Sequence, residues 1–354
     1  MARTRRPTMA DVAALAGVSL STVSLTYSGA GPISDDMKAR VEKAATELGY
    51  AGPSPQGRAL RSGRSGVIGL VIHEKIAQSF RDPITLSLLD ALMSDLSDMG
   101  LGVLLIPSPA VDSEERALLE TAPMDAAVLV RVRDHDDPAL QILRRRGIPL
   151  ALMEGTPPSG AAAVNVPDAE ATADLISRLI AAGHTRIGTV TLPWGSHRET
   201  GVIDPAAIAE PVWTPTRNRL RAFELAGVEP CVVVEARASA VSEGIAAGYL
   251  AIQHESRPTA IVAQSDLLAG GVVLAARELD LHVPRDISVT GFDGLDLAWL
   301  APLELTTYAQ DTAAKGHALG AAVKALLAGE EPLEVLTPLE FRAGGTVARA
   351  RERG

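Results

Sequence analysis

Hydroxyl side chains that could bind phosphate groups gather in one short stretch near the start of this sequence. Thr22 and Ser24 lie two residues apart in the segment 19–28, and hydroxyls of this kind are suited to phosphate oxygens. Residues 1–64 hold nine Lys or Arg against five Asp or Glu, a balance of +4 in a chain whose total is −10, which leaves −14 for residues 65–354. The basic charge is therefore concentrated where a phosphate backbone could be contacted.

Enzymatic chemistry is not indicated by the rest of the sequence. It contains no Gly-x-Gly-x-x-Gly fingerprint, no Walker-type glycine loop, no Gly-x-Ser-x-Gly elbow and no His-Glu-x-x-His motif. The seven histidines are scattered singly, which favours neither a metal site nor a catalytic dyad. The single cysteine, Cys231, stands in an apolar run and has the pattern of a small core residue. We predict a protein that is not an enzyme and uses no metal or cofactor.

Two short helices must position the hydroxyl stretch. Thr8 and Asp11 have the spacing of an N-terminal capping pair, and apolar residues follow at helical spacing at positions 12, 15 and 16. Gly17 ends this helix, and Ser19 caps a second helix over 20–26 in which Val23 faces inward. Two short helices joined by a glycine turn are typical of a helix-turn-helix, whose second helix lies in the DNA major groove. A small helical bundle without a role in DNA binding is the alternative.

A third helix and a break in the pattern follow. Ser34 caps this helix, and its inward residues are predicted to be Met37, Val41, Ala44 and Leu48. Residues 49–55 are rich in glycine and proline, and Pro55 could stand at the first position of a short helix over 54–61. An ordinary flexible linker is the alternative for this stretch. We therefore expect an all-α headpiece at 1–53 and a short helix or linker at 54–64.

From residue 65 onward, apolar strands alternate with amphipathic helices. One set of four buried strands is predicted at 67–72, 102–107, 126–131 and 148–153, and a second set at 186–192, 231–235, 259–264 and 287–292. Two such sets indicate two α/β lobes, each with a doubly wound parallel sheet. Because such sheets bind ligands at the carboxyl ends of their strands, a site is expected in the cleft between the lobes.

The sequence also resembles a known family. The segments TMADVAALAGVSLSTVS, ISDDMKARVEKAATELGY and SPQGRALRSGRSGVIGLV together resemble the lactose-repressor/galactose-repressor (LacI/GalR) family of bacterial transcription regulators. The resemblance continues in GHTRIGTV at 183–190, in Asp266–Gly270, in VPRDISVTGFDG at 283–294 and in LTT at 305–307. It covers nearly the whole chain, and it implies a helix-turn-helix headpiece followed by a two-lobed domain like that of periplasmic binding proteins.

The resemblance implies how the chain is divided between the lobes. It predicts crossings near 164–166, near 293–295 and near Glu334. The first lobe would then hold about 65–164 and 295–333, including the segment LTTYAQ and a helix over 311–328. The second lobe would hold about 165–294 and 334–354.

The resemblance further implies which residues contact DNA. They are Thr8, Ser19, Leu20, Ser21, Thr22, Ser24, Leu25, Ser28, Gly57, Arg58 and Leu60. Relatives use the positions of Leu20 and Ser21 for base contacts, and their hinge helix wedges a leucine, here Leu60, into the minor groove. Gly57 stands where relatives usually carry alanine, which predicts a weaker hinge helix here.

This sequence departs from its relatives at two positions of the second helix. Leu25 stands where they usually hold an arginine that grips a guanine, and Ser28 replaces a common asparagine. Leucine offers only apolar contact, for instance to a thymine methyl group. The alternative is that Leu25 faces the headpiece core, but it lies about 200° around the helix from the inward residue Val23.

Two residues are predicted to contact a ligand in the cleft. Arg219 stands where relatives place an arginine that grips hydroxyls or carboxylates, and Asp266 directly follows a predicted strand. Each has a structural alternative: Arg219 could be a solvated helix residue and Asp266 the N-cap of the next helix. Weaker candidates for the effector site are His73, Gln78, Phe80 and Asp293.

These interpretations together predict a homodimeric DNA-binding transcription regulator, most simply a repressor. It would bind a pseudo-palindromic operator as double-stranded DNA, with an affinity set by a small-molecule effector whose identity the sequence does not give, a sugar or related metabolite being one class. We expect it in the cytoplasm, with no membrane partner, because no apolar span or signal-peptide pattern is seen. The alternatives are a solute-binding protein of the same two-lobed fold and a DNA-binding dimer that senses no effector.

Overall fold

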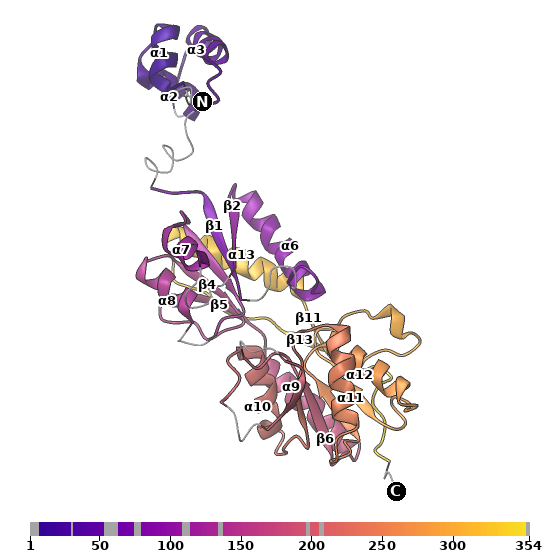
Figure 1. The fold of residues 1–354 in the computed structure, drawn as a ribbon. Helices are drawn as coiled ribbons and strands as arrows, with labels where there is room; N and C mark the ends of the chain where they lie inside the picture. The colour runs from indigo at the N-terminus through magenta and orange to yellow at the C-terminus, as the bar shows by residue number, and fades with distance from the viewer. Residues whose placement is uncertain are drawn as a thin grey trace. The chain divides into compact units, whose positions relative to one another are not determined.

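The computed structural model describes residues 7–29, 31–52, 63–73, 79–107, 114–133, 137–195, 199–204 and 209–351. The chain divides into two compact units, Met1–Gly66 and Val67–Gly354 (Figure 1). We describe each unit by itself. The predicted hinge residues Gly57, Arg58 and Leu60 and the predicted effector residue Gln78 lie outside the described residues.

The first unit is built of three helices, α1 (Met9–Ala16), α2 (Leu20–Ser28) and α3 (Asp35–Leu48). Each begins at the cap that the sequence predicts, because Thr8, Ser19 and Ser34 accept backbone N–H bonds in the first turn. Thr8 and Asp11 bond reciprocally as a capping box. Gly17 ends α1 at φ 64°, a left-handed conformation that glycine adopts without strain.

The core of this unit is small and made of short side chains. Val12, Val23 and Val41 are fully buried, and Ala13, Ala16, Ala44 and Ala45 fill the space between them. Of the apolar residues at positions 12, 15 and 16, Val12 and Ala16 are buried, whereas Leu15 is 48% exposed and Ala13 is buried instead. Met37 is exposed, so the prediction that it faces inward is wrong.

The first lobe of the second unit contains a six-stranded parallel sheet in the order β12-β5-β4-β3-β1-β2. Its strands are β1 (Val67–Ile72), β2 (Gly102–Pro107), β3 (Ala126–Val130), β4 (Leu150–Met153), β5 (Ala162–Asn165) and β12 (Glu334–Leu336). Helices α6 (Pro83–Asp98) and α13 (Thr312–Ala328) pack on one face of the sheet, and α7 (Glu114–Thr121) and α8 (Pro138–Arg145) pack on the other (Figure 1). The four strands predicted for this lobe are confirmed, and β5 and β12 extend the sheet.

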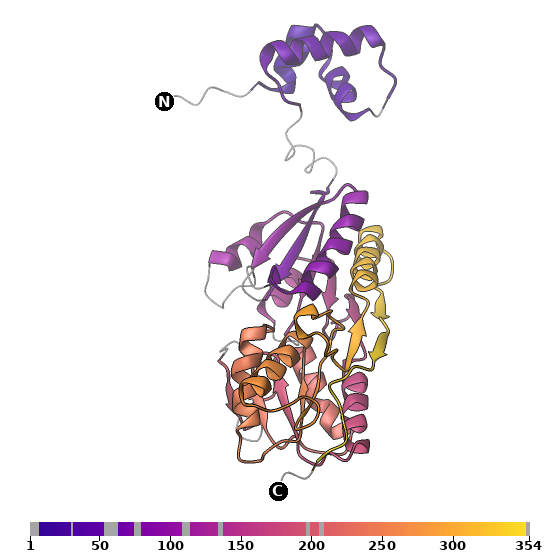
Figure 2. The same ribbon diagram turned by 90° about the vertical axis from the view of Figure 1, so that its right-hand side faces the viewer.

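The second lobe contains a five-stranded sheet in the order β10-β9-β6-β8-β7. Its strands are β6 (Ile187–Thr191), β7 (Gly201–Ile203), β8 (Val233–Glu235), β9 (Ala260–Ala263) and β10 (Ser288–Thr290). The edge strand β7 runs antiparallel to β8, whereas the other pairs are parallel. Helices α11 (Val241–Ile252) and α12 (Asp266–Glu278) cover one face, and α9 (Asp168–Ala181) and α10 (Thr214–Leu225) cover the other (Figure 2).

The lobes are joined through a small antiparallel pair, β11 (Thr307–Gln310) and β13 (Leu339–Arg342). Leu300 and Leu305 are buried in the core of the second lobe, so the chain leaves that lobe after 305 rather than near 293–295. Segment LTTYAQ therefore belongs to the joining pair and not to the first lobe. Because β12 pairs with β5 in the first sheet, the third crossing comes after Leu336 rather than near Glu334.

A helix can span a membrane only if it is long and apolar. In the part of the chain that the structure describes, no single helix has the length and apolar character needed. Helices α1 and α2 counted as one segment have the length and composition of a membrane span, but they are bent by 110° at the turn between them.

Candidate functional site: the recognition helix and the interlobe cavity

The N-terminal end of α2 presents short hydroxyl side chains and one large apolar side chain. The Ser19 hydroxyl caps the helix by accepting the backbone N–H of Thr22 at 3.1 Å, and it lies 2.6 Å from the Ser21 hydroxyl. Leu20, next to this cap, is 53% exposed. A helix start that offers exposed side chains and unpaired backbone N–H groups suits both base edges and phosphate oxygens.

The body of α2 places Val23 in the core and Leu25 outside it. Val23 is fully buried, whereas Leu25 is 36% exposed and takes no part in the headpiece core. Thr8 and Ser28 are exposed as well, and Ser24 is half-buried. The structure thus keeps the side chain of Leu25 available to a partner, as the helical spacing predicts.

Arg40 fixes the turn between α1 and α2. Its Nη2 donates to the carbonyl oxygens of Ala16 and Gly17, at 2.7 and 3.3 Å. These carbonyls lie at the C-terminal end of α1, where a cation also complements the helix dipole. An arginine on α3 therefore holds the angle between the two helices, a role that the sequence pattern did not reveal.

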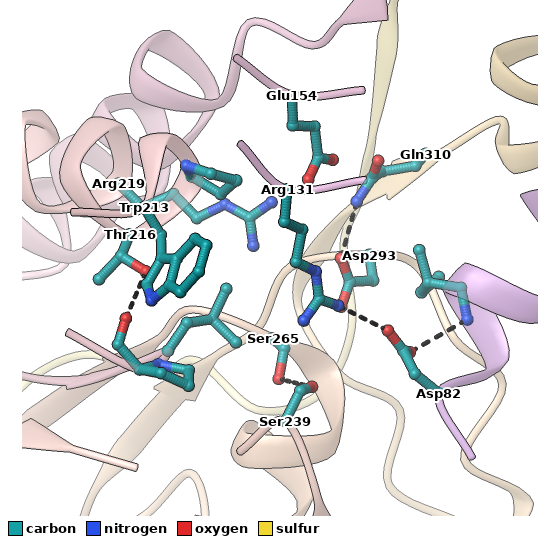
Figure 3. Close-up of a pocket in the computed structure, with 14 residues that line it drawn as sticks. Asp82, Arg131, Glu154, Trp213, Thr216, Arg219, Ser239, Ser265, Asp293 and Gln310 are labelled. Atoms are coloured by element: carbon teal, nitrogen blue, oxygen red, sulfur yellow. Dashed lines mark hydrogen bonds and ion pairs between the residues drawn. The ribbon is translucent and has the colours of Figure 1, made fainter. Parts of the chain in front are cut away.

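A cavity lies between the two lobes of the second unit (Figure 3). It encloses about 560 Å³ of space unfilled by atoms, part of it open to solvent. Its lining residues come from both lobes and from the joining strand: Asp82, Ile84, Arg131, Glu154, Leu192, Pro193, Trp213, Pro215, Thr216, Arg219, Ser239, Ser265, Asp293 and Gln310. The cavity thus combines apolar walls with convergent polar groups, the usual make-up of a small-molecule site.

The carboxyl ends of strands from both sheets meet at this cavity. Arg131 follows β3, Glu154 follows β4, and Asp293 comes three residues after β10. All three have positive φ, at 57°, 56° and 123°, which is uncommon for residues other than glycine. Strained backbone persists only where the surrounding structure holds it in place, and it is found most often at ligand sites.

Arg219 lies on α10 with its guanidinium group inside the cavity wall. It is 3% exposed, stacks on the ring of Phe292 at 3.7 Å and donates from Nη1 to the carbonyl of Gln264. Its Nε lies 3.8 Å from Oδ2 of Asp168 and has no hydrogen-bond partner among the described residues. Burial raises the pKa of Asp168 to about 6, although the charge of Arg219 opposes that rise. The guanidinium group is therefore held in position by the protein.

Asp293 shares the cavity with Arg219. Its Oδ1 accepts a hydrogen bond from Nε2 of Gln310 at 2.8 Å, which joins the second lobe to β11. Burial raises the pKa of Asp293 well above its usual range, and the nearby Asp266 and Asp82 raise it further against the charge of Arg219. The structure thus brings together two predicted effector residues, Arg219 and Asp293.

Asp266 does not line the cavity. It is fully buried, and its Oδ2 accepts the backbone N–H groups of Gly294 and Leu295, each at 2.7 Å. Its Oδ1 accepts the hydroxyl of Thr307 at 2.7 Å. Both carboxylate oxygens bind the segments that lead between the lobes, so Asp266 has a structural role, and a ligand contact by Asp266 stays a prediction. The alternative that Asp266 is the N-cap of the next helix is wrong, since Ser265 caps α12.

The two remaining effector candidates that the structure describes, His73 and Phe80, do not line the cavity. His73 is held in the first lobe, with Nε2 2.5 Å from Oδ2 of Asp137 and its ring edge-on to Trp213. Burial alone would raise the pKa of Asp137, but the hydrogen bond and charge of His73 lower it. Phe80 is 49% exposed. His73 thus contacts the cavity-lining Trp213 without lining the cavity itself.

Several cavity residues were not predicted, although the positions of some of them at strand ends indicated a role in ligand binding. Arg131 and Glu154 stand at or just after the ends of predicted strands, where doubly wound sheets bind ligands. Asp82, Trp213 and Gln310 follow no such rule. In the part of the chain that the structure describes, no group of three or more His, Cys, Asp or Glu side chains could hold a metal ion.

Two regions of the chain match known families. Residues 8–53 match the bacterial regulatory proteins of the lacI family, and residues 176–347 match the periplasmic binding protein-like domain. The HTH-type transcriptional regulator Rv3575c of Mycobacterium tuberculosis is 32% identical over 325 residues, which cover 89% of this chain and 90% of that protein. The ribose operon repressor of Escherichia coli strain K12 is 29% identical over 313 residues, covering 86% and 88%.

Solved structures share the fold of this chain. The lac repressor dimer bound to operator and the anti-inducer ONPF has a TM-score of 0.76 at 20% identity, covering 97% of this chain and 100% of that one. A LacI-family regulator from Corynebacterium glutamicum has a TM-score of 0.71 at 26% identity, covering 98% and 100%. A complex of the transcriptional regulator CelR with cellobiose has a TM-score of 0.65 at 24% identity, covering 96% and 100%.

The chain belongs to the lacI family of bacterial regulators. It is a DNA-binding transcriptional regulator with a helix-turn-helix and an effector-binding domain, and the family is one of regulators, not of enzymes. The predicted family and fold class are confirmed. The match at residues 8–53 decides against a solute-binding protein.

Proposed function

We propose that this regulator is a repressor that binds a pseudo-palindromic operator as a homodimer in the cytoplasm. The exposed N-terminal end of α2, with Leu20 and Ser21, would face the bases in each half-site. The homodimer is supported by the structure of the similar lac repressor, which is described as a dimer bound to operator. Repression is supported by a relative named as the ribose operon repressor.

The effector in this proposal is a small polar molecule bound in the interlobe cavity. The observation that carries it is the meeting of Arg131, Glu154 and Asp293, at strand ends of two lobes, with Arg219 of α10 around a space that a small molecule could fill. A relative in complex with cellobiose makes a sugar or related metabolite a reasonable class. The ligand would favour one arrangement of the lobes, and operator DNA would favour one as well, so the two should change each other's affinity by the same factor.

Operator selection followed by ligand screening tests both parts. Binding sites are first selected from random DNA, and half-site symmetry and protein stoichiometry are read from them. Hydroxylated metabolites are then screened by thermal shift and by release of labelled operator, because a ligand at a hundredfold excess over its Kd adds about 2.7 kcal/mol of stability. A metabolite that binds should also shift operator affinity. If wild type binds operator but no metabolite alters either signal, the protein is a DNA-binding dimer without an effector.

A matched pair of variants separates the cavity from the headpiece. Arg219→Met removes the cavity guanidinium group but keeps an apolar side chain against Phe292, so effector response should be lost while operator binding remains. Arg221→Met is the control on the same helix, since Arg221 does not line the cavity. An unchanged response in Arg219→Met would place the effector elsewhere.

A further inference from the structure

A buried lysine stands behind the wall of the cavity. Lys315 lies on α13 and is 1% exposed. Its Nζ donates to the carboxylate of Glu154 and to Oε1 of Gln310, the latter at 3.0 Å. Lysine is almost never fully buried unless it is paired. Lys315 does not line the cavity itself, but both of its partners do.

Lys315 balances the charge of Glu154. Burial alone would raise the pKa of this carboxyl group, but the charges of Lys315 and Arg219 and the hydrogen bond from Lys315 lower it to about 2. Glu154 is therefore ionised at neutral pH. Because the ammonium group of Lys315 contacts that carboxylate directly, the pair presents no net charge to the cavity.

The other charged groups at the cavity are matched without Lys315. Arg131 Nη2 lies 2.9 Å from Oδ2 of Asp82, and Arg219 faces Asp168. Asp293 is bonded by Gln310, and burial favours its protonated form. Removal of Lys315 would thus leave one uncompensated negative charge, on Glu154.

We propose that Lys315 determines the charge of the ligands that the cavity accepts, so that neutral hydroxyl-bearing molecules are favoured over amines. A cation entering the wild-type cavity loses its hydration and finds the Glu154 carboxylate already paired. In a chain without the lysine, the same cation takes the place of the ammonium group. This inference rests on the proposed function of the cavity as a small-molecule site, and it adds the residue that sets the charge preference.

Substitution by alanine gives a test that needs no knowledge of the effector. Lys315→Ala removes three methylene groups and an ammonium group beyond Cβ, which is the shape of propylammonium. Propylammonium chloride is compared with 1-propanol, the neutral probe of the same length, by calorimetry and thermal unfolding at pH 7.5 and constant ionic strength. We expect propylammonium to bind Lys315→Ala at least tenfold more tightly than wild type and to raise its melting temperature. The two proteins should respond alike to 1-propanol.

The double variant Lys315→Ala, Glu154→Gln is the matched control. It has the same space but no unpaired carboxylate, so it should fold and lose the preference for propylammonium. If Lys315→Ala folds only when propylammonium is present, the proposal is supported in the same way. The proposal is overturned if Lys315→Ala binds propylammonium no more tightly than 1-propanol. It is also overturned if Lys315→Ala stays unfolded with propylammonium while the double variant folds.

The outcome is distinguishable from that of the proposed function. Metabolite-driven release of operator from wild type tests whether the cavity senses an effector. Propylammonium selectivity in Lys315→Ala tests whether Lys315 balances the charge of Glu154 at the cavity wall. A wild type that responds to no metabolite, together with a selective Lys315→Ala, would leave the charge assignment intact and remove the regulatory role.

Discussion

The headpiece and the interlobe cavity hold their functional side chains in opposite ways. In the headpiece, Leu20 and Leu25 are exposed on one short helix, and the fold rests on other residues, namely the caps and the small valine and alanine core. In the cavity, Arg219 and Asp293 are buried and bonded to the protein. Substitutions on the headpiece surface should therefore change function alone, whereas substitutions at the cavity should change stability as well.

The largest effect is expected behind the cavity, at Asp266. Asp266→Ala removes the acceptor of two half-buried backbone N–H groups and of the buried Thr307 hydroxyl, at a cost of about 1–3 kcal/mol for each group left unsatisfied. We expect the free energy of unfolding of the second unit to fall by about 3 kcal/mol or more, as measured by urea denaturation.

Asp293→Asn provides the control for that measurement. Asp293 also follows a strand and is buried, but its carboxylate accepts one side-chain hydrogen bond, from Gln310. Its replacement should cost clearly less stability than Asp266→Ala. If Asp266→Ala were as stable as wild type and lost only its effector response, Asp266 would be a ligand residue after all.

A second effect of cavity burial should appear as a dependence of stability on pH. The pKa of Asp168 is raised by burial from 3.8 to about 6, so the folded state holds this proton more tightly than the unfolded state does. The group therefore contributes stability that is complete below about pH 4 and is lost as pH rises through 6. Asp168→Asn removes this loss, and its stability relative to wild type should rise by about 2 kcal/mol between pH 4 and pH 7.

Urea denaturation at a series of pH values checks this expectation. Asp174→Asn, on the exposed side of the same helix, serves as the control, since Asp174 is 40% exposed in its side chain. A stability difference between Asp168→Asn and wild type that stays constant from pH 4 to pH 7 would show that Asp168 titrates alike in both states.

The same contrast explains which features could be predicted from the sequence. Helix starts depend on residues three apart, so Thr8, Ser19 and Ser34 revealed all three headpiece helices. The four strands predicted in each lobe could be found because their apolar runs are local too, whereas the buried strand β5, with four residues, was missed. The edge strand β7 was missed because its residues are half-buried or exposed, so no buried apolar run marks it in the sequence.

The cavity could be predicted only in part, because it depends on which strand ends meet. Asp266 and Asp293 both follow strands, yet one is structural and the other lines the cavity. The difference is made by Gly294, Leu295 and Thr307, which lie 28 to 41 residues beyond Asp266 and occupy its oxygens. The pairing of Glu154 with Lys315 spans 161 residues and left no local signal in the sequence.

A smaller effect is expected in the headpiece, at the turn between its first two helices. Arg40→Met removes the donor to the carbonyl oxygens of Ala16 and Gly17, which should destabilise the headpiece by about 1 kcal/mol. Hydrogen exchange in the full-length protein should show faster exchange in α1 and α2 and none of this change in the second unit. Lys38→Met, on the exposed side of α3, is the control. Equal protection in Arg40→Met and Lys38→Met would contradict the role of Arg40.

The smallest effect on stability, with a clear effect on function, is expected at Leu25. Its side chain is 36% exposed and lies outside the core, so Leu25→Arg should change the free energy of unfolding by no more than about 0.5 kcal/mol. Leucine can offer a base only apolar contact, whereas an arginine bonded bidentately to guanine gives about 1–3 kcal/mol of discrimination. We therefore expect wild type to select half-sites without a guanine at the contacted step and Leu25→Arg to select guanine there.

Leu15→Arg adds the same charge to an exposed position of α1, so it should strengthen binding to all sequences alike without a new base preference. Selection from random DNA by the three proteins decides the matter: if Leu25→Arg and wild type prefer identical sequences, Leu25 does not face the bases, and the exposed surface of α2 is not the base-reading surface at this position.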